Sequence, residues 1–280
     1  MLQFTLGITI YVRVIKKEEN MYDVLNMALT AGIIMLRNGS ETYRVHNIIH
    51  QILFAKKIKE ESIDILVVGT GIIVTIVPDD DSPPITMNKS VDKRVNNLQK
   101  ISQVASLAKR FSNREISVTQ AMKKLKIIDD AISYNLLVRT LAICLGTASF
   151  SIAFGGSLSD GFFTFLATIV PAFFINYAKK NDFPFFLSNM VAGALVALFA
   201  LVFLTAHLVM SVNNIIASVI IILTPGVVAV TAIRDMVNGD FITGASRGID
   251  ALIQAASLAL GVGALFSLWF TIFGGIIWMG

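Results

Sequence analysis

Five apolar runs in the second half of the chain are each long enough to cross a lipid bilayer, and they restrict the possible folds more than any other feature. A helix needs about 20 predominantly apolar residues to cross roughly 30 Å of hydrocarbon. The runs predict an α-helical integral membrane protein with about five transmembrane helices. They cover approximately residues 134–154, 161–178, 184–205, 213–233 and 249–278.

Charged residues are concentrated in the other half of the chain. Residues 1–133 contain 18 of the 23 Lys and Arg residues and 14 of the 19 Asp and Glu residues. Because water-soluble surfaces carry charge and lipid-facing ones exclude it, we predict a small cytoplasmic α+β domain over residues 21–133 and a transmembrane domain over residues 134–280. Residues 1–20 are set apart as an N-terminal extension, because Met21 begins the next plausible unit. Their apolar run is too short to span a bilayer and lacks the basic start and cleavage site of a signal peptide.

The loops between the apolar runs differ in charge, and this difference predicts an orientation. The second loop contains Lys179 and Lys180 and the fourth contains Arg234 and Arg247, whereas the first and third contain no Lys or Arg. Since positively charged loops remain in the cytoplasm, we place the second and fourth loops there. An odd number of crossings then puts the N-terminal domain inside and Gly280 outside, in a multi-pass protein of the cell membrane.

The predicted soluble domain combines two periodicities. Apolar residues at helical spacing, interrupted near Asn38-Gly39, indicate two helices, and β-branched runs on either side of Gly69-Thr70-Gly71 indicate a hairpin or two adjacent strands. A capping-box pattern at Ser117 and Gln120 indicates the start of the last helix. In chain order, we expect helical residues 23–57, strands at 63–68, 72–77 and 85–87, and helices over 91–111 and from 117 to about 130.

Several functional classes lack the residues that they need. The net charge of +4 comes from basic residues interleaved with acidic ones, without the motifs of a nucleic-acid binder. The single cysteine, Cys144, can form no internal disulfide. His46 and His50 share a helix face, but the residues between them lack the Glu of a zinc hydrolase. The sequence has no nucleophile elbow, phosphate loop or dinucleotide fingerprint, so we expect no enzyme activity, cofactor or metal.

Polar groups inside the apolar runs are the candidate binding residues, because they are expensive at membrane depth. Thr224-Pro225-Gly226 interrupts the fourth run, where Pro removes a backbone donor and Gly loosens the helix. Transporters bind substrate at such breaks near the midplane, and a plain packing kink is the alternative. Arg139 can pair with a substrate or anchor at the headgroups. Asn213 and Asn214 can contact substrate or cap their helix.

Three segments match one protein family in type and order. They are AGIIMLRNGSETYRV at 31–45, the stretch from Thr86 to Arg94, and ILTPGVVAVTAIRDMVNGDFITGASRG at 222–248. With five spans, the chain resembles the threonine/serine exporter family over nearly all residues after about 21. His46 departs from the pattern, because family members usually carry an acidic residue there. Carried over position by position, the resemblance implies functional roles for Arg37, Gly39, Glu41, Thr42, Arg44, Pro225, Gly226, Arg234, Asp235, Gly239, Asp240 and Gly244.

The resemblance also implies a function. The chain is expected to be a subunit of a secondary exporter that moves a small hydrophilic metabolite of the threonine/serine type outward, driven by the proton gradient. Family members occur as one long chain or as a larger and a smaller protein, and this chain is similar to the larger one. A small, all-membrane partner subunit and an oligomer in the lipid bilayer are therefore expected. The Arg234-Asp235 segment and Asp240 are expected to gate access by docking on Glu41 and Arg44.

Two alternatives remain open on sequence grounds. Split family members also resemble exporters of dicarboxylates such as succinate. In a different class, the soluble domain can be a membrane-tethered hydrolase or a regulatory module, with the spans as its anchor. Five spans exceed what an anchor needs, and the interrupted fourth run would then have no purpose.

Overall fold

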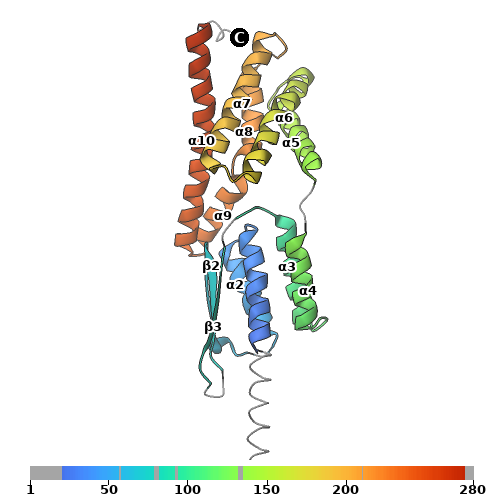
Figure 1. The fold of residues 1–280 in the computed structure, drawn as a ribbon, viewed down its shortest axis with the longest axis vertical. Helices are drawn as coiled ribbons and strands as arrows, with labels where there is room; N and C mark the ends of the chain where they lie inside the picture. The colour runs from blue at the N-terminus through green and yellow to red at the C-terminus, as the bar shows by residue number, and fades with distance from the viewer. Residues whose placement is uncertain are drawn as a thin grey trace, which may run out of the picture. The chain divides into compact units, whose positions relative to one another are not determined.

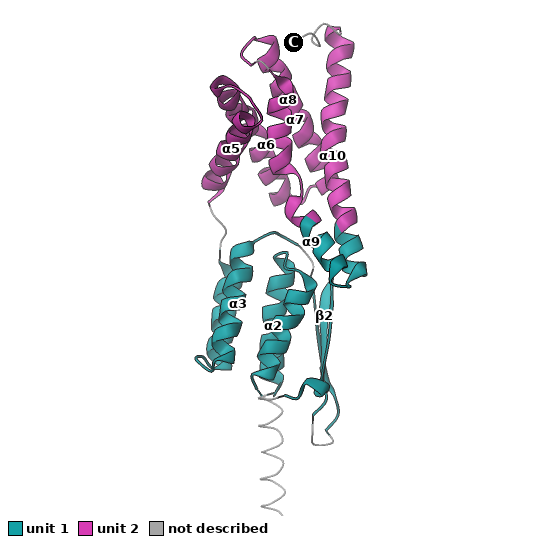
Figure 2. Cartoon of the chain, turned by 180° about the vertical axis from the view of Figure 1, so that it is seen from behind, with its two compact units in different colours: residues 1–132, 230–247 teal, residues 133–229, 248–280 magenta. Residues whose placement is uncertain are grey.

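The described residues form two compact units (Figures 1 and 2). The first unit holds residues up to Ile132 together with Val230–Arg247, and the second holds Ser133–Ala229 and the residues from Gly248 onward. The computed structural model describes residues 21–56, 58–78, 82–91, 94–131, 135–209 and 211–274, so the predicted extension over residues 1–20 lies outside it.

Two helices open the described part of the first unit. They cover residues 21–37 and α2, Thr42–Phe54, which confirms the predicted pair and the break between them. Gly39 ends the first helix with a φ of +92°, a left-handed conformation that only Gly adopts without strain. The N–H of Ser40 donates to the carbonyl of Met35 at 3.0 Å and closes the turn.

A three-stranded antiparallel sheet, ordered β1-β2-β3, follows these helices. Its strands are β1 (Ile63–Val68), β2 (Gly71–Ile76) and β3 (Ile85–Ser90). The β-branched runs predicted β1 and β2, and β3 continues to Ser90, beyond the predicted end at residue 87. A short 3₁₀ turn, Glu60–Ser62, precedes β1. Alternate residues of β2 are buried, and the buried set of Ile72, Val74 and Ile76 packs in the same core as the helices. The sheet is therefore a one-sided layer with β3 at one edge.

Helices α3 (Leu98–Ser112) and α4 (Val118–Asp130) complete this part of the first unit. The capping box predicted at Ser117 and Gln120 is present at the start of α4. The helix expected from residue 91 begins only at Leu98, because Asn97 caps it and because the backbone before the cap is bonded elsewhere. The N–H of Val95 donates to the carbonyl of Arg37 at 2.9 Å.

The second unit consists of long apolar helices, which confirms a mostly helical protein with membrane-spanning segments. Among the described residues, four helices are long and apolar enough to cross a membrane. Helices α8 and α9, bent by 51° at the Thr224-Pro225 break, can form a fifth span. The helices are α5 (Leu136–Ala153), α6 (Leu158–Lys180), α7 (Phe185–Thr205), α8 (Val212–Leu223), α9 (Gly226–Val237) and α10 (Phe241–Phe273); α9 and α10 each contribute residues to both units.

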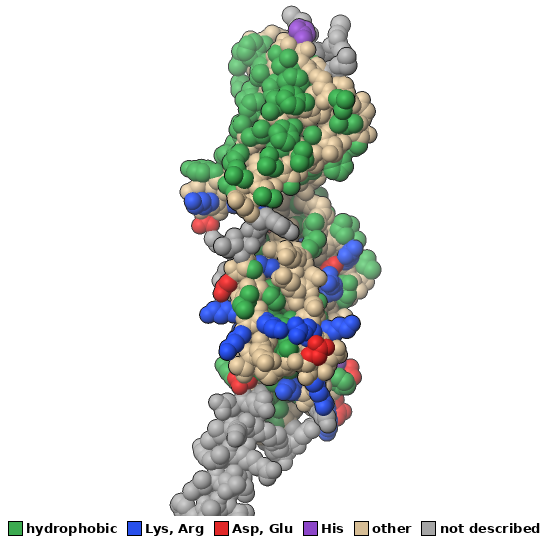
Figure 3. Space-filling model, turned by 90° about the vertical axis from the view of Figure 1, so that its right-hand side faces the viewer, with side chains coloured by type: hydrophobic (Ala, Val, Ile, Leu, Met, Phe, Trp, Pro, Cys, Tyr) green, Lys and Arg blue, Asp and Glu red, His purple; other side chains and the backbone are tan. Residues whose placement is uncertain are grey.

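The surface of the second unit is suited to lipid. Figure 3 shows hydrophobic side chains over its visible face, whereas charged side chains gather over the first unit. The interior is built from small residues instead: a Cβ at Gly193 would lie 2.4 Å from the carbonyl oxygen of Leu258, so α7 and α10 approach closely there. Small residues at helix contacts are typical of membrane proteins, where backbones must approach without a hydrophobic driving force.

Candidate functional site

The turn between α9 and α10 carries the second predicted motif, and it belongs to the first unit. Gly239 takes a φ of +91° and ends α9. Asp240 then caps α10, because its Oδ1 accepts a hydrogen bond from the N–H of Thr243 at 3.1 Å. A Cβ at Gly244 would lie 2.5 Å from Cγ of Met236 and 2.9 Å from the carbonyl of Ala232. Gly at this position therefore lets the two helices cross in contact.

Asp235 lies at the centre of a fully buried network and has no exposed surface. Its Oδ1 accepts hydrogen bonds from the N–H and the hydroxyl of Thr42, both at 3.0 Å. Its Oδ2 accepts one from Nη1 of Arg247 at 2.7 Å, and Nη2 of Arg247 donates to the carbonyl of Ser40 at 2.9 Å. Thr42 is the first residue of α2, where N–H groups lack partners within the helix and favour a negative charge. The carboxylate thus joins the two motifs.

Glu41 forms a second ion cluster beside this network. Its carboxylate lies 2.8 Å from Nη1 of Arg234 and 3.3 Å from Nη1 of Arg44. Burial alone would raise the pKa of Glu41, but hydrogen bonds from its own backbone, from Arg234 and from Arg44 outweigh it, and the pKa is lowered. Glu41 is therefore held as an anion between two cations. We call Glu41, Thr42, Arg44, Arg234, Asp235 and Arg247 the motif cluster.

A third contact ties α10 to the sheet. The N–H of Gly69, in the turn between β1 and β2, donates to the buried hydroxyl of Thr243 at 3.0 Å. A Cβ at Gly69 would lie 3.0 Å from the Thr243 methyl group, so the turn and the helix touch. The α9–α10 turn is thus fixed in the first unit by the buried bonds of Asp235 and Arg247, by the buried bond of Thr243, and by the partly exposed Arg234–Glu41 pair.

The break between α8 and α9 is a separate site, in the second unit. Pro225 has no N–H, and the hydroxyl of Thr224 donates to the carbonyls of Ile220 and Ile221 at 2.8 and 2.9 Å. The side chain therefore satisfies part of the backbone freed by the break. No heavy atom lies within 4 Å of a Cβ built on Gly226, so the space beside the start of α9 is open.

Comparison with known proteins assigns the family. The family model described as "Putative threonine/serine exporter" matches residues 26–269, which is most of the chain and includes both sites. The chain belongs to the threonine/serine exporter family. It is 26% identical over 245 residues to the "Probable threonine/serine exporter" of Mycobacterium tuberculosis, covering 85% of this chain and 45% of that protein. It is 23% identical over 245 residues to the "Threonine/serine exporter" of Corynebacterium glutamicum, covering 86% and 50%.

The chain spans about half the length of these two threonine/serine exporters. No solved structure matches it.

In this member of the threonine/serine exporter family, the two motifs contact each other through the ion pair of Glu41 with Arg234. Arg44 pairs with the same Glu41 carboxylate. Asp235 reaches Thr42 and Arg247 instead. Among the described contacts, Asp240 serves as the cap of α10 and makes no bond to Glu41 or Arg44. Arg37 pairs with Asp129 of α4, and Gly39 forms the turn before α2. Their functional roles stay predictions.

Sequence reasoning missed Arg247 and Thr243 as members of this threonine/serine exporter site. Arg247 is only 4% exposed, although the sequence marked it merely as a positive charge in a loop. Asp235 and Arg247 lie on either side of the Gly239 turn, and this opposite-charge pair in a short polar stretch was the available signal. The buried Thr243 carried none, because a Thr at the start of a helix is ordinary.

The remaining predicted residues lie apart from the break. Arg139 is exposed in the first turn of α5. Helix α8 is capped by the Ser211 hydroxyl, which accepts from the N–H of Asn214, so neither Asn side chain is the cap. Asn213 lines a hollow of about 530 Å³ between α8 and α10. Eleven residues of helix separate it from Thr224, or about 16 Å, so the structure does not bring the two predicted binding regions together.

Proposed function

We propose that this chain is the larger subunit of a secondary exporter that moves a small amino acid of the threonine/serine type out of the cytoplasm. Membership in the threonine/serine exporter family carries the proposal. The two curated relatives bear that function in their names, and the apolar helices of the second unit support a place in the membrane.

The proposed orientation puts the first unit in the cytoplasm and the C-terminus outside. Lys179 and Lys180 end α6, and Arg234 and Arg247 lie in the segment that joins the first unit. These positions support the proposal, because basic residues at span ends are retained on the cytoplasmic side. The described residues contain four candidate spans, or five if the bent pair α8–α9 is counted as one span. Only an odd number of spans places the two termini on opposite sides of the membrane, so the proposal takes the count of five.

The proposed substrate site is the break at Thr224-Pro225-Gly226. Helix α8 ends there with carbonyl groups and α9 begins there with N–H groups, so the two ends present opposite partial charges. Residues 212–229 contain no Asp, Glu, Lys or Arg. A zwitterion carries both charges itself and matches these paired helix ends, whereas a dicarboxylate would bring two negative charges to a segment without a cation. This observation favours an amino acid over succinate.

The motif cluster is the proposed gate. Helices α9 and α10 each belong to both units, and the cluster fixes their shared turn by the buried Asp235–Arg247 pair and the partly exposed Glu41–Arg234 pair. If these ion pairs rearranged, the end of α9 and the first turns of α10 would be free to move. Helix α9 follows directly after the break, so such a movement would reach the proposed substrate site. In this proposal, α9 alone connects the motif cluster in the cytoplasmic domain to the substrate site.

A partner subunit completes the proposal. As the resemblance implies, we propose that a small, all-membrane protein of the same family acts with this chain and that the assembly is an oligomer.

The test is efflux from cells preloaded with labelled threonine, serine and succinate. Cells express this chain alone or with the smaller family member, with and without a protonophore. Efflux of threonine or serine that needs both proteins and is abolished by the protonophore would support every part of the proposal. Efflux of succinate alone would replace the substrate. If none of the three leaves the cells while both proteins are in the membrane, the exporter assignment is wrong for these substrates.

A further inference from the structure

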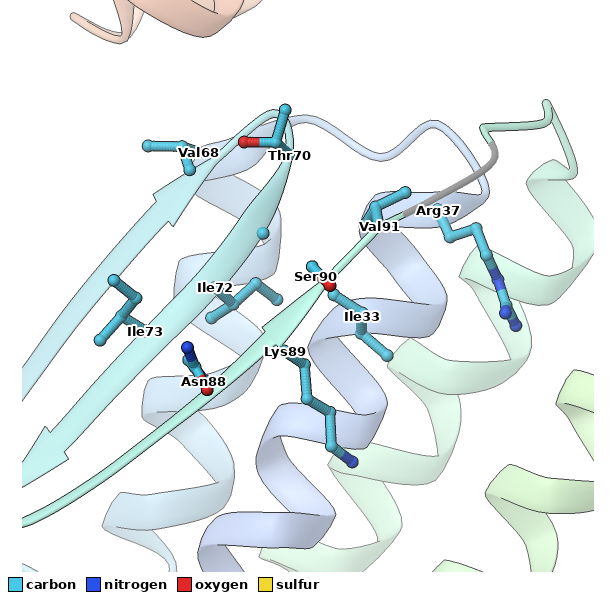
Figure 4. Close-up of a pocket in the computed structure, with 11 residues that line it drawn as sticks. Ile33, Arg37, Val68, Thr70, Ile72, Ile73, Asn88, Lys89, Ser90 and Val91 are labelled. Carbon is cyan, nitrogen blue, oxygen red and sulfur yellow. The ribbon is translucent and has the colours of Figure 1, made fainter.

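The first unit contains a hollow of about 860 Å³ beside the edge strand β3 (Figure 4). It is lined by the β1–β2 turn, the end of β3 and the helix over residues 21–37. Its apolar wall includes Ile33 and Ile72, and Thr70 and Ser90 add hydroxyl groups. A volume of this order is ordinary for a small-molecule site, and so is a mainly apolar wall with a few polar groups.

Lys89 is the charged group that sets this hollow apart. Figure 4 shows its side chain running from β3 toward the helix over residues 21–37. Its Nζ donates to Oδ1 of Asn26 at 2.9 Å and to the hydroxyl of Thr30 at 2.6 Å. Both acceptors are neutral. An ammonium group has three N–H donors, so one remains for a ligand.

No carboxylate of the described residues lies within ion-pair distance of Lys89. Other cations of this unit are paired differently: Arg37 contacts Asp129, and Arg247 contacts Asp235. Burial lowers the pKa of Lys89. A partly buried charge without a counter-ion costs free energy. If the side chain served only to link β3 to the helix over residues 21–37, a neutral hydrogen-bond donor would be sufficient. The arrangement is explained if an anion completes it.

We propose that this hollow binds a small organic carboxylate, whose carboxylate group accepts the third N–H of Lys89 while its carbon skeleton lies against Ile33 and Ile72. The helix that holds Asn26 and Thr30 ends at Arg37, four residues before Glu41 of the motif cluster. The hollow is thus a sensing site for a metabolite, and it stands whether or not the chain is an exporter.

The experiment measures amine labelling of Lys89 in the purified full chain in lipid nanodiscs, by mass spectrometry. Sodium succinate and threonine are the probes, and dimethyl succinate is the uncharged control. A bound carboxylate that adds one charge-assisted hydrogen bond slows labelling of Lys89 by roughly tenfold. Labelling of Lys100, which donates to the backbone carbonyl of Asp129, is expected to stay unchanged.

A variant supplies the second measurement. Lys89→Met keeps an unbranched side chain one heavy atom shorter and removes the charge, so the saturable, Lys89-dependent binding heat of the same probe should disappear in calorimetry. Circular dichroism of the variant checks that the fold is retained. The proposal is overturned if neither succinate nor threonine slows labelling of Lys89, if dimethyl succinate slows it equally, or if a folded Lys89→Met protein binds the probe as tightly as the wild type.

Discussion

Asp235 and Arg247 form a buried ion pair across the turn between α9 and α10, with their atoms Oδ2 and Nη1 2.7 Å apart. Twelve residues separate them in sequence, and each also bonds a group near the start of α2, Asp235 to Thr42 and Arg247 to Ser40. The pair therefore connects segments that lie about 200 positions apart in the chain. Its free energy is best tested by removing one charge at a time.

Asp235→Asn should destabilise the first unit strongly. The substitution keeps the shape but leaves the buried guanidinium of Arg247 without its counter-ion, which costs about 3–5 kcal/mol. Thermal unfolding followed by circular dichroism measures the change. The matched control is Asp129→Asn, whose pair with Arg37 is about one-third exposed and whose loss should cost less than about 1 kcal/mol. Equal losses for the two variants would contradict the role assigned to Asp235.

The contribution of Glu41 should depend on pH. Its pKa in the folded protein is lowered, so the stabilisation is fully present above the ordinary pKa of a glutamate and is lost as the pH falls through the lower, folded value. The difference in stability between the wild type and Glu41→Gln should therefore be constant near neutral pH and shrink in acid. Melting temperatures of both proteins across an acid pH series measure it. A difference that grows toward low pH would show that the sign is wrong.

Gly244→Ala should be costly because the two helices cross at this position. The new Cβ would lie 2.5 Å from Cγ of Met236 and 2.9 Å from a backbone carbonyl, and overpacking of this kind costs about 1–3 kcal/mol. Gly263→Ala in the same helix is the control, since no heavy atom lies within 4 Å of its Cβ. Thermal unfolding should separate the two variants, and a harmless Gly244→Ala would contradict the observed helix crossing.

Pro225→Ala should reduce export while expression stays intact, if the break holds the substrate. A continuous helix would withdraw backbone groups from the ligand, and loss of one such bond corresponds to roughly tenfold in flux. Pro171→Ala in α6 is the control, because that proline lies inside a helix that continues through it. The readout is efflux of labelled threonine at matched protein levels. Unchanged efflux from Pro225→Ala would remove the break from the proposed mechanism.

Local sequence patterns predicted most elements of the fold. The strands followed from β-branched runs, and α4 from a capping box whose two bonds both form. The helical spacing from residue 91 predicted a helix that the structure does not have before Leu98. The N–H of Val95 bonds instead to the carbonyl of Arg37, which is far away in sequence. The docking of Arg234 on Glu41 could be anticipated from family motifs.

Burial of Arg247 could not be read from its opposite-charge pairing with Asp235 alone. It depends on Asp235 and Ser40, which only the folded chain brings near. The same reason explains why no pattern marked residues 230–247 as part of the first unit.

That inserted segment decides when the first unit can finish folding. The N–H of Thr42 and of Gly69 and the carbonyl of Ser40 find their described partners in residues 235–247. A ribosome adds about 5–20 residues per second, so the amino-terminal part waits on the order of ten seconds after its own synthesis while the intervening helices emerge. During that interval the amino-terminal part of the unit is exposed with these polar groups unpaired. For the same reason, a fragment that stops before α5 would be an unfinished unit, and its instability would say nothing about the intact protein.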